Sequence, residues 1–287
     1  MNISNKIVLG TAQFGMDYGI ANVNGKPKHK QIFDILDLAW EKGVRRFDTA
    51  PDYGSDVLLG EFIKVNKIEN EVLVLTKISS LNNSTDFQND TIKNLELSIN
   101  NLGCPIDVLF FHNPNDSILL LKDSGFFDGL LHDYPISSLG VSVYEPNDVE
   151  KLIGCPLELA FQFPLNVLDR RFEKVKMPEG KRYARSIFLQ GLLVSKNRLR
   201  PNTKLALIDL HSKYHNKLNE YNLNPINFAF SFVANSETAD YVLLGVDNAD
   251  QLNEIFSQTL NSEEIITNLN DFVLNIDKNL LDPRTWN

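Results

Sequence analysis

Short apolar runs alternate along the whole chain with segments of helical spacing. In those segments apolar residues recur every three or four positions, as they do on one face of a helix. From Gln31 to Lys42 they form one such face, and Gly43 ends the pattern. The apolar runs predict strands at Ile7 to Gly10, Arg45 to Thr49, Val72 to Lys77, Asp107 to His112, Ser138 to Val143, Glu158 to Phe163, Ala184 to Phe188 and Tyr241 to Leu244.

The segments between these runs predict helices. They lie at Gln31 to Lys42, Asp56 to Val65, Thr91 to Leu102, Ser117 to Leu131, Pro146 to Ile153, near Leu168, Thr203 through Ala234 and Ala249 to Leu260. Nearly continuous apolar runs are typical of strands buried on both faces of a parallel sheet. Eight strand-then-helix units without a linker predict an α/β fold, a closed (β/α)8 TIM barrel. We expect a single domain over residues 1–287, with 262–287 as a C-terminal helix and tail.

The composition fits a folded protein with a small-molecule partner. Hydrophobic residues are 43% of the chain and charged residues 23%, which is ordinary for a globular protein. The formal net charge of -9 and the lack of long Lys or Arg stretches argue against a nucleic-acid partner. No apolar run approaches the roughly 20 residues that cross a bilayer, and the first residues lack a signal layout. We therefore expect no membrane association and a cytoplasmic protein.

The two cysteines point to no special chemistry. Cys104 and Cys155 each lie in a Gly-Cys-Pro turn, and neither has a second ligand-type residue at a spacing typical of metal sites. We expect two inert thiols and no metal site.

Three predicted strands end on different ionisable side chains. Asp48, Lys77 and His112 lie at the C-terminal ends of the second, third and fourth apolar runs. Parallel sheets, open or closed, place their chemistry at the rim formed by the C-terminal ends of the strands. We therefore expect these three groups to converge, together with Tyr53, which closely follows Asp48.

This set of side chains suits the reduction of a carbonyl group. A tyrosine hydroxyl has an ordinary pKa of about 10, a nearby ammonium favours the phenolate, and a carboxylate keeps that ammonium charged. An imidazole can add a hydrogen bond to the reacting oxygen. Taken singly, Asp48 could cap a turn, Tyr53 could pack, and His112 could be a loop histidine. The interpretation depends on their occurring together.

The residues around Tyr53 resemble a known family. The segment from Gly43 to Ser55, followed by Leu59-Gly60, is similar to the signature of the aldo-keto reductases, and the likeness covers nearly the whole chain. The resemblance implies an eight-stranded barrel, with Tyr53 as proton donor and Lys77 and Asp48 as tuners of its pKa. It implies that His112 orients the carbonyl group.

The same resemblance implies a nicotinamide cofactor. Ser142 and Gln162 look like the pair that holds the carboxamide, and Arg185 stands where the family often has a stacking tyrosine. Val143 stands where an asparagine is usual. The other cofactor-binding residues implied are Gly10, Thr11, Leu189, Gly191, Gly245, Gln251 and Glu254. The chain lacks the glycine-rich dinucleotide fingerprint of doubly wound sheets.

The loop from Gly245 to Glu254 bears on the choice of cofactor. It resembles the adenosine-phosphate loop of the family but carries acids and no Lys or Arg. A carboxylate favours a ribose 2′-hydroxyl, whereas a 2′-phosphate needs a basic partner. The family suggests NADP(H), while this loop makes NAD(H) possible.

These observations predict an NAD(P)H-dependent oxidoreductase that reduces an aldehyde or ketone. The polar residues Asp17, Tyr18, Asn22 and Asn113 in the predicted loops suit a sugar-like substrate. Two alternatives stay open: a Schiff-base lyase that uses Lys77 as nucleophile, and a cofactor-binding regulatory subunit with little turnover. We expect a monomer or a weak homo-oligomer.

Overall fold

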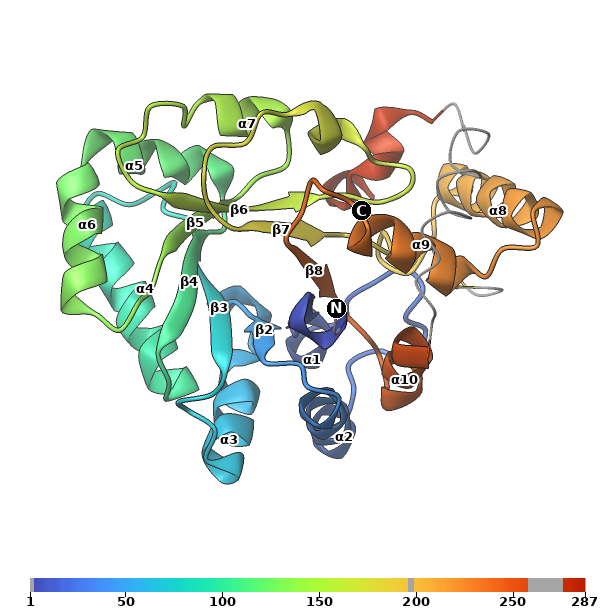
Figure 1. The fold of residues 1–287 in the computed structure, drawn as a ribbon, viewed down its shortest axis with the longest axis horizontal. Helices are drawn as coiled ribbons and strands as arrows, with labels where there is room; N and C mark the ends of the chain where they lie inside the picture. Colours follow the sequence, from blue (N-terminus) through green and yellow to red (C-terminus); the bar gives the residue numbers. More distant parts are fainter. Residues whose placement is uncertain (1–2, 196–198, 258–275, 287) are drawn as a thin grey trace.

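The computed structural model describes residues 3–195, 199–257 and 276–286. Within them, eight parallel strands form a closed barrel in sequence order, and the last strand pairs with the first. Figure 1 shows the helices arranged around these strands. The predicted (β/α)8 TIM barrel is confirmed. The strands are β1 Ile7–Gly10, β2 Arg46–Asp48, β3 Leu73–Ile78, β4 Ile106–Phe111, β5 Leu139–Ser142, β6 Leu159–Pro164, β7 Arg182–Arg185 and β8 Tyr241–Leu244.

The helices bury the apolar faces that the sequence pattern indicated. In α2 the residues Ile32, Ile35, Leu36 and Ala39 are all buried. Local signals fix the ends of α4, because Asp86 accepts a hydrogen bond from the Asn89 amide and Gly103 adopts φ 66°. The helices are α1 Ala12–Gly15, α2 His29–Glu41, α3 Asp56–Asn66, α4 Phe87–Leu102, α5 Ile118–Lys122, α6 Ser124–Asp133, α7 Pro146–Glu150, α8 Leu205–Glu220, α9 Pro225–Ala234 and α10 Ala249–Ser257.

Two predicted helices are each split in the structure. The one expected from Ser117 to Leu131 becomes α5 and α6, because Asp123 ends the first and its side chain caps the second at the Phe126 amide. The stretch from Thr203 through Ala234 becomes α8 and α9, separated by Asn222 in the left-handed region.

Two further predictions are corrected. The seventh strand was expected from Ala184 to Phe188, but β7 ends at Arg185 because Ser186 has φ 57°. The helical stretch near Leu168 is only the short 3-10 helix η4. The 3-10 helices are η1 Ile3–Asn5, η2 Pro51–Tyr53, η3 Pro114–Ser117, η4 Arg171–Lys174, η5 Lys278–Leu281 and η6 Pro283–Thr285.

The C-terminal part of the chain is only partly described. Of the helix and tail predicted over 262–287, residues 262–275 and 287 lie outside the described residues. The described part of this segment, residues 276–286, contains the 3-10 helices η5 and η6. In the described ranges, no helix combines the length and the apolar character needed to span a membrane.

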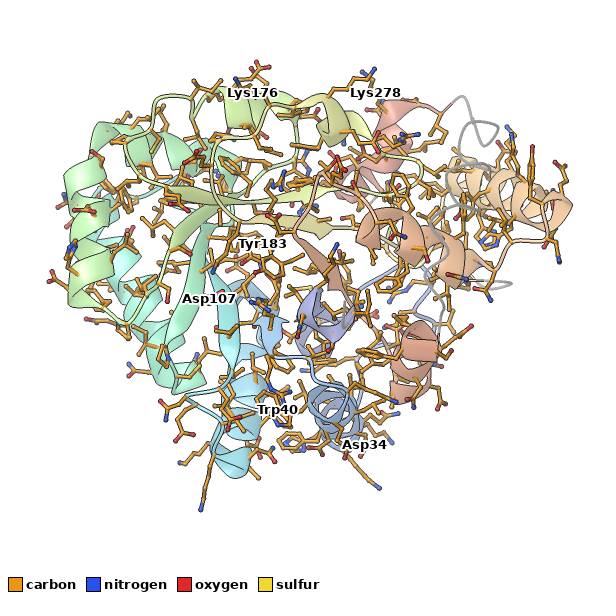
Figure 2. The ribbon with its side chains drawn as sticks, in the orientation of Figure 1. Asp34, Trp40, Asp107, Lys176, Tyr183 and Lys278 are labelled. Carbon is orange, nitrogen blue, oxygen red and sulfur yellow. The ribbon has the colours of Figure 1, made fainter. Side chains whose placement is uncertain are left out.

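Side chains fill the interior of the barrel. Tyr183 is fully buried, stacks on Tyr241 with ring centroids 4.9 Å apart, and meets Phe110 edge-on at 5.7 Å. Figure 2 shows Tyr183 in the middle of the molecule, among the strands. Because the interior is packed, a ligand has to bind at the rim and not through the barrel.

A bulge lies between β3 and β4. Val74 pairs with Ile106, but the next residue, Leu75, pairs with Val108, so that Asp107 is an extra residue in β4. Beyond the bulge, Lys77 pairs with Phe110. Val108 and Phe110 belong to the cluster inside the barrel, and side chains two residues apart share a face. The bulge thus sets which residues of β4 point inward.

Candidate active site

A cavity of about 330 Å³ lies at the C-terminal rim of the barrel. Asp48, Tyr53 and His112 line it, as the convergence argument predicted. Lys77 is absent from the lining because it lies beneath it, with only 1% of its surface exposed. The structure therefore brings the four predicted residues together but gives Lys77 no direct access to the cavity.

Lys77 and Asp48 form a buried ion pair. Nζ of Lys77 lies 2.7 Å from Oδ1 and 2.8 Å from Oδ2 of Asp48, and it also donates to the backbone oxygen of Thr49 over 2.8 Å. Gln162 donates from Nε2 to Oδ2 of Asp48 over 2.8 Å. Buried charges persist only when they are paired and hydrogen-bonded. The Lys77 Nζ thus has three oxygen acceptors, which fix its position.

The backbone around Tyr53 is held by a close packing contact. Tyr53 ends η2, and Gly54 follows it in the left-handed region with φ 70°. The short helix α1 packs against this turn at Gly15, where an added Cβ would lie 1.7 Å from the backbone oxygen of Tyr53. Only glycine fits there, so the first βα connection positions the phenol.

The phenol of Tyr53 retains its proton. Burial raises its pKa well above the ordinary value of 10, and the nearby carboxylate of Asp48 adds to the shift. Lys77 lies with Nζ 5.0 Å from the centroid of the Tyr53 ring. We expected this ammonium to favour the phenolate, but Asp48 already neutralises it. The net upward shift leaves a protonated hydroxyl at neutral pH.

His112 meets Tyr53 edge to face, with ring centroids 5.7 Å apart and planes at 89°. Its Nδ1 atom lies 3.2 Å from Oδ2 of Asp52. Burial and the charge of Lys77 lower the pKa of His112, although the hydrogen bond to Asp52 acts in the opposite direction. The imidazole is therefore neutral at neutral pH. The role of Asp52 was not recognised in the sequence.

Most of the predicted cofactor-binding residues line the same cavity. They are Gly10, Ser142, Gln162, Arg185, Leu189, Gly191, Gly245, Gln251 and Glu254. Thr11 does not line it: its hydroxyl is fully buried and bonds to the backbone oxygen of Asp48 and to Ser55. Thr11 therefore supports the site from behind.

In this part of the cavity, two buried polar groups make no hydrogen bond to the described residues. Ser142 and Gln162 are each 2% exposed. Among the described residues, neither the Ser142 hydroxyl nor the Gln162 amide oxygen has a hydrogen-bond partner, because only the amide nitrogen of Gln162 is engaged, by Asp48. A hydroxyl and an amide oxygen match the polar groups of a carboxamide, so these residues fit a nicotinamide.

Glycines shape the rest of the cavity wall. A Cβ added at Gly245 would lie 2.3 Å from the side chain of Gln13, and one at Gly191 would lie 2.5 Å from that of Ala21. Leu189 and Gln190, next to Gly191, have φ 47° and 53°. Strained residues of this kind cluster at ligand-binding loops. At both glycines a neighbouring side chain fills the space that a Cβ would need, so packing requires glycine there.

Arg185 lines the cavity, but its guanidinium is already engaged by the protein. Its guanidinium donates to the backbone oxygen of Val143 over 2.9 Å and stacks 4.1 Å from the ring centroid of Tyr144. Arg284 of η6 lies 3.6 Å from the centroid of the same ring. Tyr144 also lines the cavity, and the sequence argument missed it because both of its arginine neighbours are distant in the chain.

The loop from Gly245 to Glu254 is internally bonded. Gln251 accepts from the Asp247 amide over 2.8 Å, and Asn248 accepts from the Gln251 amide over 2.9 Å. A basic residue, Arg200, lies nearby and was not recognised in the sequence. Burial raises the pKa of Asp247, while the charge of Arg200 acts to lower it. Arg200 also forms an ion pair with Asp17.

The four polar residues proposed for a sugar-like substrate divide into two pairs. Tyr18 and Asn22 line the cavity. Asp17 pairs with Arg200, and Asn113 caps η3 and donates to Asn82 over 3.0 Å.

Within the described ranges, no cluster of three or more His, Cys, Asp or Glu side chains could hold a metal ion.

Comparisons with known proteins point to one family. The model of the aldo/keto reductase family matches residues 6–267. The chain is similar to the chloroplastic pyridoxal reductase of Arabidopsis thaliana, with 32% identity over 140 residues, 42% of this chain and 37% of that protein. The match thus covers well under two thirds of that relative. The fold is similar to that of the glycerol dehydrogenase AKR11B4 from Gluconobacter oxydans, with TM-score 0.69, 21% identity and coverage of 93% of this chain and 90% of the other.

Proposed function

The chain belongs to the aldo/keto reductase family, and from that premise we propose that it reduces an aldehyde or ketone with NADH or NADPH. The observation that carries the proposal is the arrangement of Tyr53 between the Lys77–Asp48 ion pair and His112 at one end of the cavity. The family supports an oxidoreductase, and these side chains suit proton donation to a carbonyl oxygen.

Each residue has a distinct task in this proposal. The protonated Tyr53 hydroxyl donates its proton to the carbonyl oxygen as negative charge develops there. Lys77, bonded to Asp48 and with Nζ 5.0 Å from the centroid of the Tyr53 ring, holds the carboxylate of Asp48 in place beside the phenol. His112, which packs edge to face against Tyr53, orients the substrate. When bound, a reduced nicotinamide supplies the hydride for the carbonyl carbon.

The residues that would hold the cofactor lie along the rest of the cavity. Ser142 and the amide oxygen of Gln162 are available to a carboxamide, and Gly191 and Gly245 belong to the cavity wall. The loop from Gly245 to Glu254 contributes acids, which support the use of NADH beside the NADPH that the family suggests.

The substrate in this proposal is a small hydroxylated carbonyl compound. Tyr18, Asn22 and Tyr144 add hydroxyl and amide groups to the cavity wall. One relative is named a pyridoxal reductase, which supports an aldehyde substrate. A cytoplasmic location and a monomer or weak homo-oligomer stay predictions.

The geometry disfavours a Schiff-base lyase. A nucleophilic lysine must reach the substrate as a free amine, whereas Lys77 is buried, lies outside the cavity lining and has three oxygen acceptors.

A screen of small aldehydes, ketones and sugars with both cofactors tests the proposal, with the absorbance of the reduced nicotinamide as readout. We expect oxidation of the cofactor with at least one hydroxylated aldehyde or ketone. A protein that binds the cofactor but turns over no compound in a broad panel would instead be a regulatory subunit.

A further inference from the structure

A chain of buried hydroxyl groups runs behind the cavity and ends on Asp56, a side chain that the proposed reaction does not use. The Thr11 hydroxyl donates to the backbone oxygen of Asp48 over 3.0 Å and lies 2.8 Å from the Ser55 hydroxyl. The Ser55 hydroxyl lies 3.0 Å from that of Thr49, which is bonded in turn to Oδ1 of Asp56. The three hydroxyl residues are fully buried, and Asp56 is 2% exposed. Bulk water therefore does not reach these groups.

The chain has four contacts but only three hydroxyl protons. Each hydroxyl carries one proton, and each hydrogen bond uses one. If Asp56 is ionised, its carboxylate only accepts, so that Thr49 donates to it while Thr11 donates to Asp48. The proton of Ser55 then serves one of its two neighbours, and the other contact brings two oxygens together without a proton. A carboxyl proton on Asp56 removes this deficit, because each hydroxyl then accepts one bond and donates the next.

The second carboxyl oxygen of Asp56 also fits a neutral acid. Oδ2 is buried and has no hydrogen-bond partner in the described part of the chain. A charged oxygen without donors is costly to bury, whereas the carbonyl oxygen of a neutral acid costs much less. Asp56 lies in the first turn of α3, and this end of a helix favours an anion. Among the described residues, however, Thr49 alone bonds to its carboxyl group.

Charged groups act on Asp56 from three neighbouring elements. Burial is the strongest influence and raises the pKa of Asp56, while the bond to Thr49 and the ammonium of Lys77 on β3 act to lower it. The carboxylates of Asp48 on β2 and Asp52 in η2 raise the pKa further. Lys77 is bonded to Asp48, so its charge is already matched. The surroundings and the proton count thus both favour the neutral acid.

We propose that Asp56 is a positioning residue: it stays a neutral carboxylic acid and donates a hydrogen bond into the hydroxyl chain, which fixes the turn that carries Tyr53. Thr49 and Ser55 lie on either side of that turn, η2, and their hydroxyls bond to each other. An ionised Asp56 would leave one contact of the chain without a proton and place a second negative charge behind the buried ion pair. The effect on turnover rests on the proposed function, whereas the protonation state of Asp56 does not.

Carbon NMR of protein labelled with ¹³C at the aspartate carboxyl groups measures this protonation state without substrate. The signal that is missing from Asp56→Asn identifies Asp56. We expect this signal to keep the position of a neutral acid from about pH 4 to pH 7. The control is Asp209, which is exposed on α8 and is identified with Asp209→Asn; its signal should titrate near the ordinary pKa of about 4. A carboxylate signal for Asp56 at pH 7 overturns the inference.

The stability of the two proteins should respond differently to pH. The folded state keeps a proton that the unfolded chain releases above about pH 4, so unfolding of the wild type becomes easier as the pH rises. Asp56→Asn has no such proton. We therefore expect the urea midpoint of the wild type to fall relative to that of Asp56→Asn between about pH 4 and pH 7. A difference between the midpoints that does not change with pH contradicts the inference.

Two variants separate the hydrogen-bond donor from the bulk of the side chain. Asp56→Asn is neutral and can donate from its amide to Thr49, so we expect it to retain most of the wild-type kcat. Asp56→Ala has no donor, and kcat should fall by about tenfold to a hundredfold because Tyr53 is misplaced. The Kd for NADPH should stay the same in both variants, since Asp56 lies outside the cavity lining.

The failure of this inference differs from the failure of the proposed function. An Asp56→Asn variant as slow as Asp56→Ala, or an Asp56→Ala variant as fast as the wild type, overturns the positioning role, while carbonyl reduction by the wild type upholds the proposed function. A neutral Asp56 in a protein that reduces no carbonyl compound rejects the proposed function and supports the inferred state of the carboxyl group.

Discussion

Gln162 on β6 donates a hydrogen bond from Nε2 to Oδ2 of Asp48 on β2 over 2.8 Å, across the mouth of the barrel. The amide nitrogen is thus committed to the carboxylate, and only the amide oxygen remains for a ligand. The same carboxylate oxygen also accepts from Lys77. One side chain therefore connects the predicted cofactor site with the ion pair under the catalytic phenol.

Removal of one partner of the buried ion pair should destabilise the fold. Lys77→Met leaves the Asp48 carboxylate buried without its cation, and we expect the free energy of unfolding to fall by about 3–5 kcal/mol. Urea denaturation measures it. Lys213→Met, which removes an exposed pair with Asp209, is the control and should change stability by less than about 1 kcal/mol. Equal effects of the two variants would contradict the structural role of the pair.

Tyr53→Phe should remove turnover without weakening cofactor binding. The substitution deletes only the hydroxyl oxygen that donates the proton, and a general acid typically contributes about 10²–10⁴ in rate. We expect kcat to fall by that factor while the Kd for NADPH, measured by fluorescence titration, stays within about twofold. Undiminished turnover would falsify the assignment of Tyr53 as proton donor.

The raised pKa of Tyr53 predicts how carbonyl reduction responds to pH. Proton donation requires the protonated phenol, and because the folded pKa lies above the ordinary 10, this form persists up to at least that pH. We expect no loss of kcat from ionisation of Tyr53 between about pH 7 and pH 10. The difference in tyrosinate absorbance between wild type and Tyr53→Phe locates the titration. A step below pH 10 in that difference would show that the phenol is not buried as the structure has it.

The acidic loop after β8 should keep the preference for NADPH weak. We expect the Kd values for NADPH and NADH to differ by less than a hundredfold, which corresponds to about 2.7 kcal/mol. Glu254 lines the cavity, so Glu254→Lys should shift the ratio towards NADPH by about tenfold. Asp250→Lys makes the same change of charge at an exposed position and serves as control. A wild-type preference for NADPH above a hundredfold refutes the inference from the loop.

Both thiols were expected to be inert, but their different burial indicates that they should differ in reactivity. Burial raises the pKa of Cys104 to about 12, and since the thiolate is the nucleophile, this thiol should be unreactive at pH 8. Cys155 is only partly buried. We expect a disulfide reagent to modify one thiol per native chain, none in Cys155→Ser and both wild-type thiols after unfolding in urea. Rapid modification of the native Cys155→Ser variant would contradict this order.

The sequence was sufficient to predict the barrel and the position of its chemistry. Runs such as Val72 to Lys77 are apolar because both faces of the strand are buried, and parallel strands bring Asp48, Lys77 and His112 to one rim. The predicted end of β7 was wrong because it depends on the backbone conformation of Ser186, which no apolar pattern encodes.

Side-chain partners from distant segments were not predictable in the same way. The bond between Gln162 and Asp48 joins residues 114 positions apart. The contact of Arg284 with Tyr144 depends on where η6 lies in the fold, 140 positions further along the chain. Asp52 could have been noticed as an acid next to Tyr53, but only the structure shows that it faces His112.

The extra residue Asp107 fixes the register of β4, so this strand does not tolerate a change in length. Residues alternate between the two faces of a strand, so a shift of one position exchanges them. Deleting one residue between Val108 and His112 would turn the imidazole towards the surrounding helices. The active site would then lack this side chain, although the gene would still encode the histidine. A deletion in the loop before β5 has no such effect. Among homologous genes, we expect gaps of one codon to be absent from this strand and common in the loops that flank it.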